Sequence, residues 1–307
     1  MPILWYFELV GVIAAGIMFF DWSCESYYYF RALCARKNLT KYGLGSWALV
    51  TGATDGIGLG FAQVLAKSGF NIVLVSRSQD KLDRVAEELK IYSVDVLTVA
   101  ADFSKCPENP TEFFNNIDEK TRELDVSLIV NNVGTAVPGL FHTLSPQDLA
   151  TQNALNLWPI VYLSKIFIRR MLNRSKPSGV INISSTGSIL PCSGLTVYSA
   201  GKSFDHLFTL DMNEEIRYLV NQEKLKEIDI LSFQPAFVET PLTSGFSSKP
   251  LVITPVQCAE RALSVLGKCN YSSGHWKSMV YSIFYRNVPW YINAKISMSV
   301  IKKDFKK

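Results

Sequence analysis

Short apolar runs alternate with segments of helical periodicity between about residues 45 and 240. Six runs have the length of strands and are hydrophobic throughout, at 47–51, 71–76, 97–101, 126–131, 179–183 and 228–234. Helical stretches begin near Gly58, Asp80, Asn109, Pro146 and Val197. Unbroken apolar strands joined by helices are typical of a parallel sheet that is covered on both faces. The pattern predicts an α/β fold with a doubly wound parallel sheet and a ligand crevice at the carboxyl ends of its strands.

Length and composition limit what else the chain contains. With 307 residues, of which 48% are hydrophobic, there is room for one large α/β domain and little more. We place that domain at 41–270, after an N-terminal segment at 1–40 and before a tail at 271–307. A net charge of +4 without a dense basic stripe argues against a nucleic-acid partner. The six cysteines show no C-x-x-C spacing, so the sequence predicts neither a metal site nor a disulfide framework.

The N-terminal segment is almost wholly apolar from residue 2 to residue 20, with Glu8 as its only charged residue. This length is close to the lower limit for a helix that spans a bilayer, so we predict a membrane anchor. A cleaved signal peptide and a buried core helix are the alternatives, although no basic residue precedes the run and no clear cleavage site follows it. Basic residues follow at positions 31, 36, 37 and 41, which places the main domain on the cytosolic side. Trp22 and the tyrosines at 27–29 would then lie among the lipid headgroups.

The tail from about Tyr271 combines many aromatic residues with basic ones and is interrupted by Pro289. It is too charged and too broken to predict a second span. Either it lies in the membrane interface as an amphipathic segment, or it packs on the main domain as a helix.

A glycine-rich turn follows the first predicted strand, in the sequence WALVTGATDGIG at 47–58. Gly52, Gly56 and Gly58 allow a tight turn and a close approach of the backbone to a pyrophosphate, and the helix that follows offers free N–H groups. This order of strand, glycines and helix predicts a Rossmann-type dinucleotide site. We expect the residues between the glycines to line the same site, at Thr54, Asp55 and Ile57.

The end of the second predicted strand indicates which dinucleotide binds. Sites that prefer NAD carry an acidic residue there, whereas this strand ends in Ser76 and Arg77. Arg77 can form charge-assisted hydrogen bonds with a 2′-phosphate, which favours NADPH over NADH; a solvated loop arginine is the alternative. Asp102, just after the third strand, could hold the adenine amino group. Asn131, at the end of the fourth, could brace the sheet near the cofactor.

Tyr198 and Lys202 stand four residues apart in YSAGK, and therefore on one face of a helix. A free tyrosine gives up its proton only at about pH 10, so proton exchange at neutral pH needs a nearby cation that stabilises the phenolate. Lys202 can supply that charge and can also bind the nicotinamide ribose. Such a pair is common on surface helices, so its assignment depends on the other motifs.

Together these motifs resemble the short-chain dehydrogenases/reductases over roughly residues 45–240. TGATDGIG at 51–58 and NNVG at 131–134 stand in the family's order with the later residues. The family's serine stands thirteen positions before its tyrosine, an interval that Ser185 fits. The resemblance implies a catalytic set of Asn156, Ser185, Tyr198 and Lys202.

A further segment, QPAFVET at 234–240, takes the place of the family's Pro-Gly-x-x-x-Thr. Ala236 stands where the family usually has glycine, which puts the backbone conformation there in doubt. The resemblance implies cofactor contacts from Val238 and Thr240, with Thr240 near the nicotinamide carboxamide.

The N-terminal apolar segment and the motifs at 45–58, 131–134 and 181–185 are similar to the membrane branch of this family. That branch holds the very-long-chain 3-oxoacyl-CoA reductases and the 17-beta-hydroxysteroid dehydrogenases. It implies the endoplasmic reticulum membrane, a catalytic domain facing the cytosol, NADPH and a lipid-like substrate. It also implies a homodimer formed by the helices around Asn156 and Tyr198, and association with fatty-acid elongation enzymes. The terminal lysines do not fall at the usual positions of a dilysine retrieval signal.

We therefore expect reduction of the 3-keto group of a long-chain 3-oxoacyl-CoA. As the resemblance implies, Tyr198 donates the proton, Ser185 polarises the carbonyl oxygen, Lys202 stabilises the phenolate, and Asn156 holds a water linked to Lys202. The segment 241–255, rich in Ser, Gly and Pro, is expected to close over the acyl chain or sterol. Reduction or oxidation of a steroid or retinoid is the alternative. A retired enzyme that acts as a membrane-bound scaffold is a third, against which the complete catalytic set argues.

Overall fold

The computed structural model describes residues 2–246 and 251–304. Within this part of the chain, seven strands form one parallel sheet in the order β3-β2-β1-β4-β5-β6-β7. The strands are β1 (Trp47–Thr51), β2 (Asn71–Ser76), β3 (Val96–Ala100), β4 (Val126–Asn131), β5 (Ser178–Ile183), β6 (Ile228–Phe233) and β7 (Tyr271–Ser272). The strand order runs outward from β1 in both directions, so the sheet is doubly wound as predicted.

Helices fill the connections between the strands and form both ends of the described part of the chain. They are α1 (Pro2–Cys34), α2 (Gly56–Lys67), α3 (Gln79–Leu89), α4 (Pro110–Lys120), α5 (Pro146–Met171), α6 (Thr196–Glu223), α7 (Pro255–Val265), α8 (Trp276–Asn287) and α9 (Trp290–Asp304). Short 3-10 helices are η1 (Thr40–Tyr42), η2 (Lys90–Tyr92), η3 (Phe103–Lys105), η4 (Phe141–Thr143), η5 (Thr186–Ser188) and η6 (Pro241–Phe246).

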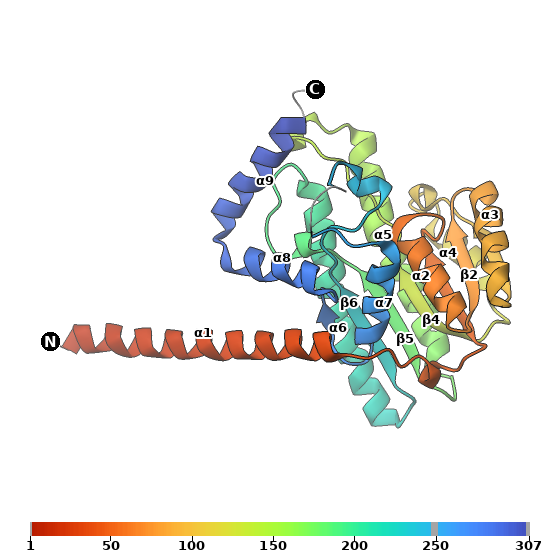
Figure 1. Ribbon diagram of the computed structural model, residues 1–307, viewed down its shortest axis with the longest axis horizontal. Coiled ribbons are helices and arrows are strands. Elements are labelled where there is room, and N and C mark those ends of the chain that lie inside the picture. The colour runs from red at the N-terminus through yellow and green to blue at the C-terminus, as the bar shows by residue number, and fades with distance from the viewer. Residues whose placement is uncertain (1, 247–250, 305–307) are drawn as a thin grey trace.

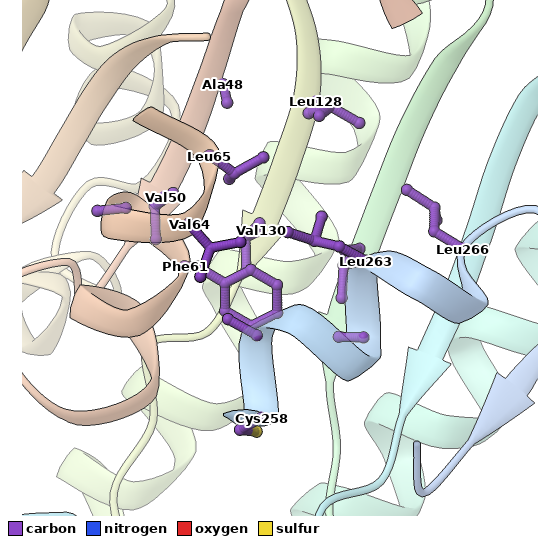
Figure 2. Close-up of a cluster of buried hydrophobic side chains, with 14 of the residues drawn as sticks. Ala48, Val50, Phe61, Val64, Leu65, Leu128, Val130, Cys258, Leu263 and Leu266 are labelled. Atoms are coloured by element: carbon purple, nitrogen blue, oxygen red, sulfur yellow. The ribbon is translucent and has the colours of Figure 1, made fainter. Parts of the chain in front are cut away.

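Two hydrophobic layers lie on opposite faces of the sheet. On one face, Phe61 and Leu65 of α2 and Leu263 of α7 pack over Val50 of β1 and Val130 of β4, as Figure 2 shows. The other face is covered by α4, α5 and α6, and its layer includes the fully buried Phe114 and Phe167. Burial on both sides explains why the strands are hydrophobic throughout rather than alternately.

The six strands expected from the sequence are all present, with ends that differ by at most one residue. The sheet nevertheless continues past residue 270, because β7 pairs with β6 through Ser232–Tyr271 and Phe233–Ser272. The tail expected from Tyr271 therefore begins with a strand, and its helices start at Trp276.

The N-terminal helix α1 projects from the domain as a single long rod (Figure 1). Its stretch Tyr6–Cys34 is long and apolar enough to cross a membrane, and its most apolar window has no contact with the domain that would bury it. A buried core helix is thereby excluded, and the helix indicates membrane anchoring. The helix is longer than the apolar run at 2–20, because it continues to Cys34.

Candidate active site

The turn between β1 and α2 is held in a conformation that requires its glycines. Gly52 and Gly56 have φ angles of +62° and +50°, in the left-handed region that side chains disfavour. A Cβ added to Gly58 would lie 2.2 Å from the carbonyl oxygen of Gly52, and one added to Gly52 would lie 2.9 Å from Nδ2 of Asn132. The backbone is therefore bare at the start of α2, where free N–H groups can meet a pyrophosphate.

Asn132 fixes this turn to the end of β4, a role that we did not anticipate. Its Nδ2 donates to the carbonyl oxygen of Thr51 at 2.9 Å, while its backbone N–H donates to the Thr51 hydroxyl at 2.9 Å. The neighbouring Asn131 points into the sheet, where its amide donates to Oδ1 of Asn182 at 2.8 Å and to the hydroxyl of Ser164 at 3.2 Å. Asn131 thus braces the sheet, and Asn132 is the asparagine that holds the glycine turn.

The predicted residues of the turn meet the end of β2. The hydroxyls of Thr54 and Ser76 lie 2.9 Å apart. Asp55 is the N-cap of α2 and accepts a hydrogen bond from the backbone N–H of Gly56 at 2.7 Å. Ile57 is half-buried in the first turn of α2. These contacts order the loop that would lie under the phosphates.

Arg77 and Asp102 follow two adjacent strands at the same edge of the sheet. Arg77 comes directly after β2 and is exposed, so its guanidinium is open to a ligand. Oδ1 of Asp102 accepts hydrogen bonds from the backbone N–H and the hydroxyl of Ser104, at 3.1 and 2.8 Å. Asp102 therefore caps η3, while its half-buried position leaves it at the rim of the crevice.

The segment after β6 returns to the glycine turn. A Cβ added to Gly56 would lie 2.9 Å from Cγ2 of Thr240, so this threonine packs directly against the turn. Val238 is buried and bridges Ile253 in parallel register. The expected substrate loop at 241–255 begins with η6, and its residues 247–250 lie outside the described residues.

The four residues of the implied catalytic set come from three elements. Ser185 follows β5 and its hydroxyl accepts from the backbone N–H of Gly187 at 3.0 Å. Tyr198 is half-buried in the first turn of α6. A Cβ added to Gly187 would lie 3.4 Å from the Ser185 hydroxyl and 3.9 Å from the Tyr198 ring, so both side chains border the same glycine.

Lys202 and Asn156 approach each other from α6 and α5. The amide of Asn156 donates to the carbonyl oxygen of Thr135 and accepts from its N–H, both at 2.9 Å. A Cβ added to Gly134 would lie 2.9 Å from Oδ1 of Asn156 and 3.5 Å from Nζ of Lys202. The structure therefore gathers Asn156 and Lys202 around one bare backbone position.

Asp205 is a residue of this site that the sequence analysis did not identify. Nζ of Lys202 donates to Oδ2 of Asp205 at 2.9 Å and to the carbonyl oxygen of Ile183 at 2.7 Å. Both ionic side chains are buried, and Oδ1 of Asp205 has no hydrogen-bond partner among the residues that the structure describes. The sequence signal was an acidic residue three positions after the lysine, which on a helix lies on the same face.

Burial and charge have opposing effects on the pKa values of Lys202 and Asp205. Burial alone would lower the pKa of Lys202, but the charges of Asp205 and Tyr198 and the hydrogen bond that Lys202 donates to Asp205 outweigh it and raise that pKa above its ordinary value. Burial also raises the pKa of Asp205, against the opposing effect of Lys202. Lys202 is therefore held as a cation next to the tyrosine.

Comparison with known proteins shows a family match. The sequence profile of the short chain dehydrogenase family matches residues 46–250. A very-long-chain 3-oxoacyl-CoA reductase of Macaca fascicularis is 33% identical over 267 residues, which cover 85% of this chain and 81% of the relative.

Solved structures have the same fold. One from a study of 7beta-hydroxysteroid dehydrogenase stereoselectivity has a TM-score of 0.73 at 23% identity, covering 85% of this chain and 99% of that one. The 3-ketoacyl-(acyl-carrier-protein) reductase from Brucella melitensis, complexed with NADH, has a TM-score of 0.62 at 26% identity, covering 72% of this chain and 90% of that one. The chain belongs to the short-chain dehydrogenase/reductase family, whose enzymes act on CH–OH or C=O groups and typically use NAD(P).

Proposed function

We propose that this protein reduces the 3-keto group of a long-chain 3-oxoacyl-CoA to a 3-hydroxyl group, with NADPH as cofactor. The observation that carries the proposal is the 33% identity to a very-long-chain 3-oxoacyl-CoA reductase over 85% of the chain. An apolar N-terminal helix suits an enzyme whose substrate carries a long acyl chain, because both partition into the membrane.

The residues of the crevice fit a dinucleotide. The bare backbone at Gly52 and Gly58 leaves room for a pyrophosphate at the start of α2, and the exposed Arg77 at the end of β2 offers a cation for a 2′-phosphate. Thr54, Asp55, Ile57 and Ser76 would shape the loop beneath it, and Thr240 would approach from the opposite side. When bound, the cofactor supplies the hydride.

The chain's own residues then handle the oxygen of the substrate. Ser185 donates a hydrogen bond that polarises the carbonyl and orients it next to Tyr198. Tyr198 gives its phenolic proton to the oxygen as the alkoxide forms. Lys202, kept cationic by Asp205, stabilises the phenolate that remains. Asn156 fixes the backbone at Thr135 beside Lys202, where a water can return the proton.

The cellular setting follows from the same proposal. We place α1 in the endoplasmic reticulum membrane with the domain on the cytosolic side, where other enzymes of fatty-acid elongation would be its partners. Phe204 and Leu207 are exposed on α6, at 40% and 60% of their surface. Such apolar positions would suit a homodimer through α5 and α6.

The test is NADPH oxidation by the detergent-solubilised full-length protein with a long-chain 3-oxoacyl-CoA, beside a panel of ketosteroids. We expect turnover of the acyl-CoA and its loss in Tyr198→Phe, which removes the proton donor and keeps the ring. Turnover of steroids alone would move the assignment to hydroxysteroid dehydrogenation. Tight NADPH binding without turnover of either would leave a membrane-bound scaffold as the better account.

A further inference from the structure

We propose that α8 and α9 form a second membrane contact, which holds the segment between Ser185 and Tyr198 against the bilayer surface. The corner between the two helices lies on the side of the domain from which α1 projects (Figure 1). The inference uses the placement of α1 in a bilayer but does not depend on which substrate is reduced.

Side-chain contacts hold the last part of α1 against the domain. Oε1 of Glu25 in α1 lies 2.6 Å from Nη1 of Arg286 in α8 and also accepts from the hydroxyl of Tyr271. Nη2 of Arg261 in α7 donates to the carbonyl oxygen of Ala32 at 2.6 Å. Contacts at two levels of one helix set the direction in which the domain faces the membrane.

α8 meets α1 just beyond the apolar run that would lie in the hydrocarbon core of the bilayer. Asp21 is the first charged residue after the apolar run of α1, and Glu25 is four residues further, about 6 Å along a helix. The headgroup layer is about 5–7 Å thick on each side of a hydrocarbon core of about 30 Å. Arg286, held by Glu25, therefore lies at headgroup depth, and α9 begins four residues later at Trp290.

α9 has polar residues on the side that faces the domain and apolar residues on the side that faces away from it. Its inward side is polar: Nδ2 of Asn293 donates to the carbonyl oxygen of Pro191 at 3.0 Å, and the hydroxyl of Ser297 accepts from the N–H of Ser193 at 3.1 Å. Its outward side carries Ile292 and Ile296, which are 39% and 42% exposed. A helix packed on a soluble domain shows the opposite arrangement.

α8 also carries apolar residues on its outward side, while its buried side holds Met279 together with two serines. Ser278 and Ser282 are buried, with the Ser282 hydroxyl 2.7 Å from that of Ser273. Val280, Ile283 and Phe284 are exposed on the other side. Together with Trp290, Tyr291, Ile292 and Ile296 they make an apolar surface, which we call the α8–α9 face. An apolar face with aromatic residues at headgroup depth fits the boundary between headgroups and acyl chains.

The contact has a consequence for the site. Pro191 and Ser193, which α9 holds, belong to the segment that joins Ser185 to Tyr198. A bilayer against the α8–α9 face would therefore lie next to the rim of the catalytic crevice, where an acyl chain can pass from the lipid.

The test uses two exposed tryptophans of α8 and α9 as a matched pair. Trp290 and Trp276 are 63% and 53% exposed. Trp276 begins α8, ten residues before Arg286 and about 15 Å along the helix. α8 runs from the domain toward its corner with α9 (Figure 1), so its start lies further from the proposed bilayer. The full-length protein is reconstituted in phosphatidylcholine vesicles with and without bromine near the headgroup end of the acyl chains. The quenched part of the tryptophan emission is then compared between wild type, Trp290→Phe, Trp276→Phe and Trp22→Phe.

The emission that Trp290→Phe removes should belong to the part that bromine quenches, as for Trp22→Phe. The emission that Trp276→Phe removes should belong to the part that bromine does not quench. If Trp22 is quenched but Trp290 behaves like Trp276, the α8–α9 face does not meet lipid and is covered by protein or water. If neither Trp22 nor Trp290 is quenched, α1 itself is outside the bilayer and the inference fails with it. Turnover of a 3-oxoacyl-CoA in detergent is measured separately, so failure of the proposed function is distinguishable from either result.

Discussion

Lys202 is only 5% exposed, and a buried lysine keeps its charge only where other groups compensate for lost hydration. Asp205 is the charged group that compensates, with its Oδ2 2.9 Å from Nζ. The carboxylate also fixes where the ammonium sits relative to Tyr198. Asp205 is therefore a positioning residue for the proton donor rather than a group that touches substrate.

Replacing Asp205 with Asn should move the alkaline limb of the kcat–pH profile to lower pH. In the wild type Asp205 helps to raise the pKa of Lys202 above its ordinary value. Without the carboxylate, burial lowers that pKa, so Lys202 loses its proton at lower pH. Asp211→Asn, at an exposed position of the same helix, is the control. An unchanged limb with a merely lower kcat would show that Asp205 has only a structural role.

Arg77→Ala should weaken NADPH much more than NADH. Loss of a charged hydrogen bond costs about 1.5–3 kcal/mol, so kcat/KM for NADPH should fall about 10- to 100-fold. Arg84→Ala, an exposed arginine of α3, is the matched control. Equal losses with both cofactors would contradict the assignment of Arg77 to the 2′-phosphate.

At the scale of elements, the glycine turn shows why a short motif can determine a site. The turn between β1 and α2 has no room for side chains at Gly52 or Gly58, and Asn132 closes it from β4. The end of β1, the start of α2 and the end of β4 therefore meet at one close-packed backbone junction. A change at any of them should disturb the others.

Gly58→Ala should lose NADPH binding and should cost about 1–3 kcal/mol of the free energy of unfolding. The added Cβ would lie 2.2 Å from the Gly52 carbonyl oxygen, so the turn must open. Cofactor binding by fluorescence titration and thermal unfolding together measure the effect. Gly16→Ala in the exposed part of α1, where a Cβ meets nothing within 4 Å, should change neither. Normal NADPH binding by Gly58→Ala would contradict a pyrophosphate site at this turn.

The elements were predictable where the local pattern was strong. Six strands could be predicted because their sequences are hydrophobic throughout, and the glycine spacing predicted the position of the turn. β7 was missed because two residues carry no periodicity and pair only through tertiary contact. Asn132 and Asp205 were missed for a similar reason, since their roles depend on which side of an element is buried. The extension of α1 beyond Phe20 was missed because polar residues follow the apolar run, and the partner of Glu25 lies far along the chain in α8.

At the scale of the whole molecule, the domain is joined to its anchor by a polar contact rather than by a flexible linker. Glu25 meets Arg286 and Tyr271, and Oε2 of Glu25 is buried without a hydrogen-bond partner among the described residues. This arrangement connects the membrane helix, the edge of the sheet and α8. In the proposed membrane arrangement, this contact would set the orientation of the crevice relative to the bilayer.

Glu25→Ala should loosen this connection without changing the dinucleotide site. It leaves Arg286 and Tyr271 without their shared partner, at a cost of about 1–3 kcal/mol. Hydrogen–deuterium exchange should rise in α8 and in the last third of α1, while the β1–α2 turn stays protected. Asp21→Ala, one turn earlier on the same face of α1 but at an exposed position, should leave the exchange of α8 unchanged. The same exchange in both variants would mean that α1 is not held by Glu25.

The proposed reaction is reduction at carbon 3 of a long-chain 3-oxoacyl-CoA. The most direct measurement supplies NADPH deuterated at its transferable position to the full-length protein and analyses the product by mass spectrometry. Our account predicts 3-hydroxyacyl-CoA with one deuterium at carbon 3, and no such product from Tyr198→Phe. An unlabelled product, or a labelled ketosteroid product with the acyl-CoA left unchanged, would contradict it.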